Sequence, residues 1–279
     1  MSNILLLHHL GLGDHIMCHG IVREYCKKYR AVTILSLPRN HNSVSFMYRD
    51  LKNLMIVTVN DTFTESSIFF NKSKLELDKY DSIKIIGFEY LNRQSGEPLE
   101  KQFYRIAGVN IEKKWNNFFV QRDLEREGVL FKQTAPQKDY VFLHEDISKN
   151  YRINRGKINK KYELYTPTEK LTGNIFDYCT IIERAKEIHV IDSSFMFLID
   201  CLKYKNLDQK LYIHRYAREN ADWKLPILRK KWEIINMENY HLGFIRYVRR
   251  RLTEYKGRLI SKLTRRGSIQ SHNYGKALF

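Results

Sequence analysis

The chain has 279 residues, of which 43% are hydrophobic and 13% aromatic, so it can form two domains of roughly 120 residues with packed cores. Its formal net charge of +17 is uneven, because residues 241–279 contain ten Lys or Arg and one acidic residue. Apolar runs fall short of the ~20 residues of a membrane span, the four cysteines lack C-x-x-C spacing, and no signal-peptide pattern is present. These features argue against an integral membrane protein and a disulfide scaffold. They predict a cytoplasmic protein with reduced thiols and anionic partners.

The first half of the sequence alternates short apolar runs with helical patterns. We expect strands at residues 4–8, 32–37, 55–59 and 83–87. We expect helices at residues 15–29, 43–51, 64–79 and 97–107. This alternation predicts a parallel sheet with crossover helices. A short strand at residues 115–120 and a helix at residues 122–131 should follow.

A second alternation begins after the turn-rich residues 134–138, which separate two predicted domains, 1–134 and 135–240. The expected strands of the second domain are residues 140–144, 163–165, 188–191 and 211–214. The expected helices are residues 176–185, 194–204 and 225–231. The predicted fold class is therefore α/β, with two Rossmann-like domains.

The turn after the first strand, Gly11-Leu12-Gly13-Asp14, is the first candidate site. Its glycines permit a tight turn and a close approach of the backbone to a ligand. Ligands of open α/β sheets bind beyond the carboxyl ends of the strands, so Asp14 would project into that crevice as a candidate general base. A dinucleotide fingerprint would need a third glycine where Ile16 stands. The alternative is that the glycines only form the turn and Asp14 caps the helix.

The second candidate site is Asp192-Ser193-Ser194, between an apolar strand and an apolar helix. Helix N-termini offer unpaired N–H groups and the positive end of a dipole, and the serines add hydroxyl donors, so a diphosphate can dock here. A similar turn, with Thr172 and Asn174, precedes another predicted helix and faces the same crevice. Ordinary helix capping is the alternative for both turns.

Polar residues also follow the first strand of the second half. His144 and Glu145 stand at its carboxyl end, and Arg152, Arg155 and Lys157 follow on a loop. Arginines bind phosphate through bidentate hydrogen bonds, which makes this loop a candidate phosphate site; a solvated loop is the alternative. Neighbouring strand residues point to opposite faces and the chain has no Asp-x-Asp motif, so no metal site is predicted.

Residues 241–279 carry a separate signal. One stripe of the expected helix is apolar and consists of Phe244, Val248, Leu252, Tyr255, Leu259 and Leu263. Much of the remainder is basic, including Arg249 and Arg250. A basic amphipathic helix is typical of elements that bind an anionic membrane surface, where each basic residue contributes about 1 kcal/mol. The alternative is a helix packed on the protein body, and residues 267–279 are expected to be disordered.

The two α/β halves, the Gly-Leu-Gly-Asp turn after the first strand and the Asp-Ser-Ser turn before a late helix together resemble the GT-B glycosyltransferases. The similarity is greatest to the heptosyltransferase-like proteins of glycosyltransferase family 9, and it covers about residues 3–215. The resemblance implies that Asp14 is the catalytic base and that the turn at Asp192 contacts the phosphates of a nucleotide-sugar donor. Ser194 replaces the Gly of the family's Asp-Thr/Ser-Gly-x-x-His loop, and Phe197 stands where the family has His. The family's usual Lys-x-Trp segment is not found after the first strand of the second half.

The residues and the resemblance predict a metal-independent, inverting glycosyltransferase that needs no cofactor beyond its nucleotide-sugar substrate. It would extend a surface polysaccharide or a lipid-linked glycan at the cytoplasmic face of the membrane. Asp14 would act as the base with His15 as a helper. The expected donor-binding set is Gly11, Gly13, His144, Glu145, Arg152, Arg155, Lys157, Thr172, Asn174, Asp192, Ser193 and Ser194.

Two other functions are consistent with the sequence. The net charge of +17 favours a nucleic-acid-binding protein, but the charge is concentrated in the tail and no RNP, KH or zinc motif appears. The second alternative is a non-catalytic, GT-B-like scaffold held at the membrane.

Overall fold

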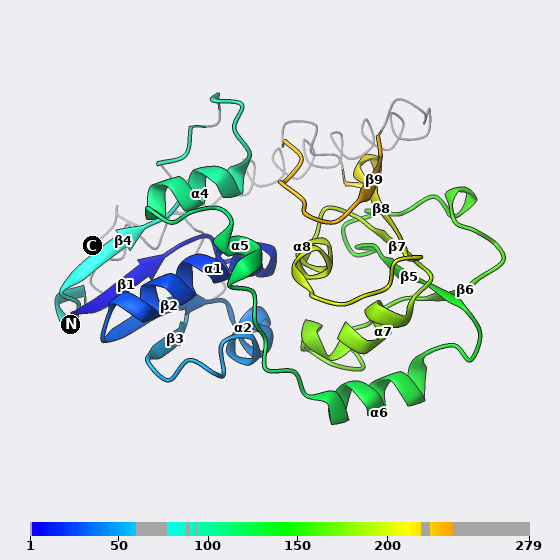
Figure 1. Ribbon diagram of the computed structural model, residues 1–279, viewed down its shortest axis with the longest axis horizontal. Coiled ribbons are helices and arrows are strands. Elements are labelled where there is room, and N and C mark those ends of the chain that lie inside the picture. Colours follow the sequence, from blue (N-terminus) through cyan, green and yellow to red (C-terminus); the bar gives the residue numbers. More distant parts are fainter. Residues whose placement is uncertain (1, 60–76, 88–89, 93, 219–223, 237–279) are drawn as a thin grey trace, which may run out of the picture.

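The computed structural model describes residues 2–59, 77–87, 90–92, 94–218 and 224–236, which form two lobes side by side (Figure 1). Each lobe is built on one parallel sheet. The first sheet has the order β3-β2-β1-β4, formed by β1 (Asn3–Leu7), β2 (Ala31–Ser36), β3 (Leu54–Thr58) and β4 (Ser82–Ile85). The second has the order β6-β5-β7-β8-β9, formed by β5 (Tyr140–His144), β6 (Glu163–Tyr165), β7 (Glu187–Val190), β8 (Lys210–His214) and β9 (Trp232–Ile235). The predicted pair of parallel α/β sheets is thus confirmed.

Helices cover both sheets. Those of the first lobe are α1 (Leu12–Lys28), α2 (His41–Met47), α4 (Leu99–Ala107) and α5 (Lys113–Asn116). Those of the second lobe are α7 (Cys179–Arg184) and α8 (Ser194–Cys201), and α6 (Leu124–Thr134) packs against α7. Short 3₁₀ turns complete the described chain: η1 (Pro38–Asn40), η3 (Leu77–Lys79), η5 (Arg155–Lys157), η6 (Ile175–Tyr178) and η7 (Arg215–Ala217).

The inner strands β1, β2, β5 and β7 are buried on both faces, as expected for parallel sheets with crossover helices. Successive side chains of a strand point to opposite faces, so Leu5 and Leu7 of β1 enter a small cluster on one side of the first sheet. Leu6 of β1 and Phe142 of β5 instead join the largest cluster, which contains buried side chains of both lobes. The two lobes therefore share a continuous apolar core.

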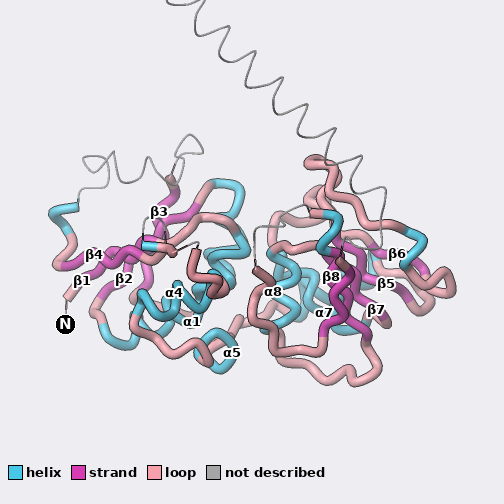
Figure 2. Tube along the Cα trace, turned by 90° about the horizontal axis from the view of Figure 1, so that it is seen from above, coloured by secondary structure: helices cyan, strands magenta, loops and turns pink. Residues whose placement is uncertain are grey.

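The lobes meet through their helices. α1 packs directly against α8, on the facing sides of the two lobes (Figure 2). α2 packs against η6. In the second contact, the rings of Phe46 and Phe176 stack with centroids 5.8 Å apart. Since α1 and α8 each follow the carboxyl end of a strand, this interface lies beside the edges where α/β sheets bind ligands.

Two local predictions were wrong, and one strand was missed. Residues 115–120 were expected to form a strand, but the chain forms the short helix α5, because Trp115 turns inward to bond Asp200. Residues 225–231 were expected to be helical, yet they are irregular and lead into β9. The backbone N–H groups of Ile227 and Arg229 donate to Glu100 and Asp200, so they are not available for a helix. Most of the expected helix at 64–79 and the whole tail from residue 241 lie outside the described residues.

All four cysteines are free, as predicted from their spacing, and Cys18, Cys179 and Cys201 are buried. Within the described part of the chain, none of the helices has both the length and the apolar character needed to cross a bilayer.

Candidate active site

The first turn begins α1 earlier than its sequence pattern predicted. Gly11 is the N-cap residue, in extended conformation with φ −64° and ψ 144°, and Asp14 falls in the first helical turn. A Cβ atom on Gly11 would lie 2.6 Å from Asp14 Oδ2, which shows that the carboxylate folds back over the start of the helix. A side chain at position 11 would therefore push the Asp14 carboxylate out of this position. A negative charge is favoured at this end of a helix.

His15, the predicted helper, is completely buried, at 0% exposure. Its ring lies edge-on to that of His8, with centroids 4.7 Å apart, and burial places the pKa of His15 well below the usual range. The imidazole is therefore neutral and out of reach of a substrate in this structure.

Gly13 brings the first turn into contact with the second lobe. A Cβ atom on Gly13 would lie 3.2 Å from Phe197 Cδ2 and 3.8 Å from Ser194 Cα. A Cβ atom here would press on the Phe197 ring, so a glycine suits this close contact. The start of α1, with Asp14, and the start of α8, with Ser193 and Ser194, are therefore neighbours across the interface.

Ser193 is the N-cap residue of α8, but its side chain makes no capping hydrogen bond. The hydroxyl instead pairs with His144 Nδ1 at 3.0 Å. The first N–H groups of α8 thus receive no cap from Ser193, and a helix N-terminus in this condition is suited to an anion. Burial lowers the pKa of His144 to about 4, so its ring is neutral near pH 7.

Thr172 and Asn174 behave differently, because their polar atoms are used locally. Asn174 caps η6 by accepting a bond from Phe176 N, and its amide donates to Asp177 Oδ1 at 3.0 Å. Thr172 Oγ1 donates to the same carboxylate at 2.5 Å. This turn also docks on α2, where Ser43 Oγ accepts from Ile175 N at 3.1 Å. The structure thus gives the turn a capping and interface role.

Glu145 and Arg155 form a clamp on the loop after β5. The carboxylate, in a residue 8% exposed, accepts from Arg155 Nη1 and Nη2 at 3.0 and 2.7 Å and from Ile153 N at 2.8 Å. Burial acts to raise the pKa of Glu145, but the bonds from Arg155 and Ile153 give a net lowering. Arg155 is therefore occupied by an internal partner, whereas Arg152 and Lys157 are exposed on the same loop.

Two arginines that the sequence analysis missed lie beside Asp192. Arg215 Nε is 3.3 Å from Asp192 Oδ2, and Arg218 donates to the Asp192 carbonyl oxygen. Burial raises the pKa of Asp192, an effect that the two guanidinium groups oppose. Both arginines follow the carboxyl end of β8, just as Glu145 follows β5, so their position after an apolar strand was a usable signal.

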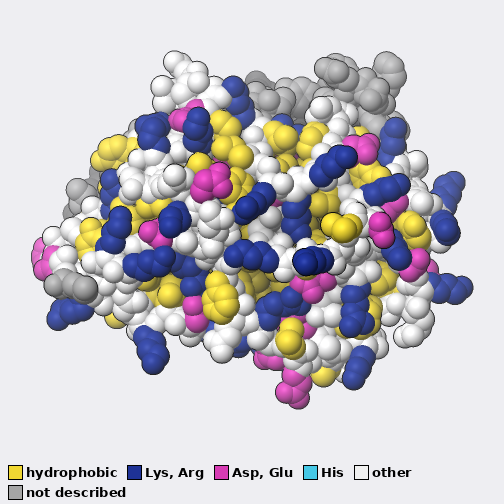
Figure 3. Space-filling model, in the orientation of Figure 1, with side chains coloured by type: hydrophobic (Ala, Val, Ile, Leu, Met, Phe, Trp, Pro, Cys, Tyr) yellow, Lys and Arg dark blue, Asp and Glu magenta, His cyan; other side chains and the backbone are white. Residues whose placement is uncertain are grey.

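These residues combine a carboxylate on one lobe with an uncapped helix end and two arginines on the other. The described residues include no cluster of three or more His, Cys, Asp or Glu side chains placed to hold a metal ion. Figure 3 shows Lys and Arg side chains spread across both lobes on one face of the molecule, with fewer acidic side chains among them. Such an arrangement can bind a ligand that carries phosphate and can remove a proton from a second ligand.

Neither a known protein-family model nor a curated protein sequence matches this chain. Solved structures do match. ADP-heptose LPS heptosyltransferase II of E. coli superposes with a TM-score of 0.55 and 10% identity, over 85% of this chain and 91% of that one. A glycosyltransferase family 9 protein from Veillonella parvula DSM 2008 gives a TM-score of 0.55 and 8% identity, over 89% and 91% of the two chains. This chain therefore has the two-lobed GT-B fold of those two proteins, as its sequence motifs predicted.

Proposed function

We propose that this protein is a glycosyltransferase that moves a sugar from a nucleotide-sugar donor to a glycan acceptor. The observation that carries the proposal is the contact of Gly13 with Ser194 and Phe197, which sets Asp14 beside the uncapped N-terminus of α8. The shared fold supports the same activity, because both structural relatives are named as glycosyltransferases. The E. coli relative is named for ADP-heptose, which makes ADP-heptose the first donor to test.

In the proposed reaction, Asp14 accepts the proton of an acceptor hydroxyl as its oxygen attacks the anomeric carbon. The bond from that carbon to the diphosphate breaks, and its electron pair leaves with the nucleoside diphosphate. The N-terminus of α8, with Arg215 and Arg218, would stabilise the charge that develops on the diphosphate. A single attack from the side opposite the leaving group inverts the anomeric centre. This scheme involves no metal ion.

Ser193 and Ser194 are the proposed hydroxyl contacts of the donor, with the exposed Arg152 and Lys157 near the same edge. The proposed acceptor is a surface polysaccharide or a lipid-linked glycan. Residues 241–279 would contact the membrane. The tail residues lie outside the described structure. Their test is liposome binding, which should be lost when residues 241–279 are removed.

The first experiment measures thermal unfolding with UDP, GDP, ADP and CMP. A nucleotide present at 100 times its Kd should add about 2.7 kcal/mol of stability. The second uses Asp14→Asn, which keeps the shape of the side chain but cannot take a proton. We expect kcat for nucleotide release to fall by about 10²–10⁴-fold, while nucleotide binding is retained.

The matched control is Asp139→Asn, since that carboxylate is 60% exposed. It should leave kcat unchanged. Near-normal turnover in Asp14→Asn would contradict the base assignment, and loss of transfer in EDTA would contradict the metal-free scheme. A Kd that stays tight for nucleic acid at physiological salt would favour the nucleic-acid-binding alternative.

A further inference from the structure

A cavity of about 600 Å³ lies at the end of α8 opposite Ser193, away from the candidate active site. Its size falls in the range of small-molecule sites. Its walls come from the end of α5, the end of α8, the chain before β8 and the segment before β9. The residues that matter to the argument are Trp115, Asp200, Lys203, Tyr204, Arg229, Lys230 and Lys231.

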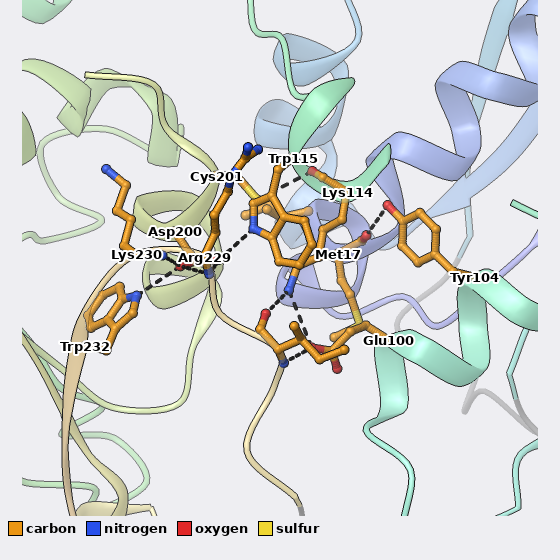
Figure 4. Close-up of polar contacts among 12 residues, drawn as sticks. Met17, Glu100, Tyr104, Lys114, Trp115, Asp200, Cys201, Arg229, Lys230 and Trp232 are labelled. Carbon is orange, nitrogen blue, oxygen red and sulfur yellow. Dashed lines mark hydrogen bonds and ion pairs between the residues drawn. The ribbon is translucent and has the colours of Figure 1, made fainter. Parts of the chain in front are cut away.

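The acidic residue of this cavity is fully occupied by neutral donors. Asp200 is 2% exposed and accepts bonds from the indole nitrogens of Trp115 and Trp232 at 2.8 and 3.0 Å. It also accepts from the backbone N–H groups of Arg229 and Lys230, each at 3.0 Å (Figure 4). The carboxylate therefore joins three chain segments and forms no ion pair with the neighbouring cations.

The basic residues that line the cavity outnumber the acidic ones. Lys203, Arg229, Lys230 and Lys231 line it, and none of them forms an ion pair with a carboxylate in the described part of the chain. Four cations thus face one saturated carboxylate. Such a concentration of like charge is costly to the fold and favourable to an anionic ligand.

Lys230 is the most constrained of these cations. Its Nζ lies 3.5 Å from the centroid of the Tyr204 ring, and it points away from the Glu100 and Lys114 pair (Figure 4). Burial lowers the pKa of Lys230 to about 8, against the opposing influence of Asp200 and Glu183. The side-chain amide nitrogen of Gln209, which also lines the cavity, is already used, because it donates to the carbonyl oxygens of Ile182 and Ala185 at 2.8 and 2.7 Å.

We propose that this cavity is a second ligand site that binds a small phosphate-bearing anion through Lys203 and Lys230. Lys231 and Arg229 would add positive charge to the site. Trp115 and Tyr204 would form its apolar wall. The site is separate from the proposed donor site, since it adjoins the C-terminal end of α8 and not its N-terminal end.

The probe is inorganic pyrophosphate, titrated calorimetrically into the full chain. The double variant Lys203→Met with Lys230→Met should raise the Kd of pyrophosphate at least 10-fold. Lys205→Met is the matched control, because Lys205 is exposed two residues from Lys203 but does not line the cavity. It should leave the Kd within 2-fold. The same Kd in the double variant as in the parent would overturn the proposal, as would a lack of pyrophosphate binding.

Pyrophosphate can also bind the proposed donor site, so Arg215→Gln with Arg218→Gln is the distinguishing variant. It should keep the cavity-dependent binding and lose only nucleotide binding. If pyrophosphate binding disappears in this variant and persists in the lysine variant, the cavity proposal fails while the donor site stands. If the lysine double variant unfolds, Lys203→Met alone decides, because Lys203 is exposed and its replacement should still weaken binding at least 3-fold. If vesicles containing phosphatidic acid compete with pyrophosphate, the phosphate of the natural ligand belongs to a lipid headgroup. If they do not compete, the natural ligand is a soluble phosphate compound.

Discussion

The turn that ends at Asn174 and the turn that ends at Ser193 look alike in sequence but differ in what their polar atoms do. Asn174 caps η6, and its amide bonds Asp177. Ser193 makes no capping bond, so α8 begins with backbone donors that its N-cap side chain leaves open. The side chain of Asn174 is used within its own turn, whereas the backbone donors that Ser193 leaves open can bind a ligand. The comparison therefore predicts two kinds of mutational effect, one on stability and the other on binding.

The largest effect on stability should come from the buried pair of Lys114 and Glu100. Both side chains are almost fully buried, their charged atoms lie 3.4 Å apart, and Lys114 Nζ donates to Ile227 O at 2.7 Å. Lys114→Met leaves Glu100 as an uncompensated buried charge. We expect the free energy of unfolding in urea to fall by about 3–5 kcal/mol.

Lys113→Met is the matched control for that experiment. Lys113 is the neighbouring residue, its side chain is 40% exposed, and its ion pair with Glu24 is 3.8 Å long. Its replacement should change stability by less than about 0.5 kcal/mol. Equal effects at the two positions would show that the buried pair does not contribute in the way its geometry indicates.

His8 and His144 allow the same comparison between the lobes, because each lies at the carboxyl end of a strand. His144 bonds Ser193, but His8 Nδ1 faces the carbonyl of His9 at 2.7 Å and its Nε2 is buried without a hydrogen-bond partner in the described structure. Burial lowers the pKa of His8 to about 4. The unfolded chain takes up the proton near pH 6.5, before the folded chain can, so stability falls as the pH falls from about 6.5 towards 4.

His8→Phe removes this titration and keeps a ring beside His15. Between pH 7 and pH 5, the variant should lose about 2 kcal/mol less unfolding free energy than the parent chain. Urea unfolding at both pH values measures the difference. Equal losses in the two proteins would show that His8 is protonated as readily in the folded chain as in the unfolded one.

The sequence predicted the two sheets because the strands are continuous apolar runs and the apolar residues between them recur with the spacing of a helix. It also predicted the turns at Asp14 and Ser193, since both follow such runs. It failed where distant side chains decide the local structure. Residues 225–231 were expected to form a helix, but backbone N–H groups of this segment donate to the side chains of Glu100 and Asp200. The same reasoning missed Arg215 and Arg218, whose closeness to Asp192 depends on β8 lying beside β7.

The remaining predictions compare the two turns directly, and the first of them concerns nucleotide binding. Ser193→Asp places a carboxylate at the N-terminus of α8, where it would occupy the open backbone donors and repel a diphosphate. We expect the Kd of the nucleotide that stabilises the protein most to rise about 10-fold, which corresponds to about 1.4 kcal/mol. Ser193→Asn, which adds a neutral side chain of similar shape, should have a much smaller effect.

The other turn supplies the contrasting result. Asn174→Ala removes the cap of η6 and should lower the free energy of unfolding by about 1 kcal/mol. Nucleotide affinity, measured by the same titration, should not change, because the polar atoms of Asn174 already face Phe176 and Asp177. Two results would contradict this comparison: a higher nucleotide Kd in Asn174→Ala, or an unchanged Kd in Ser193→Asp. Either result would mean that internal hydrogen bonding does not distinguish the binding residues of this interface from the structural ones.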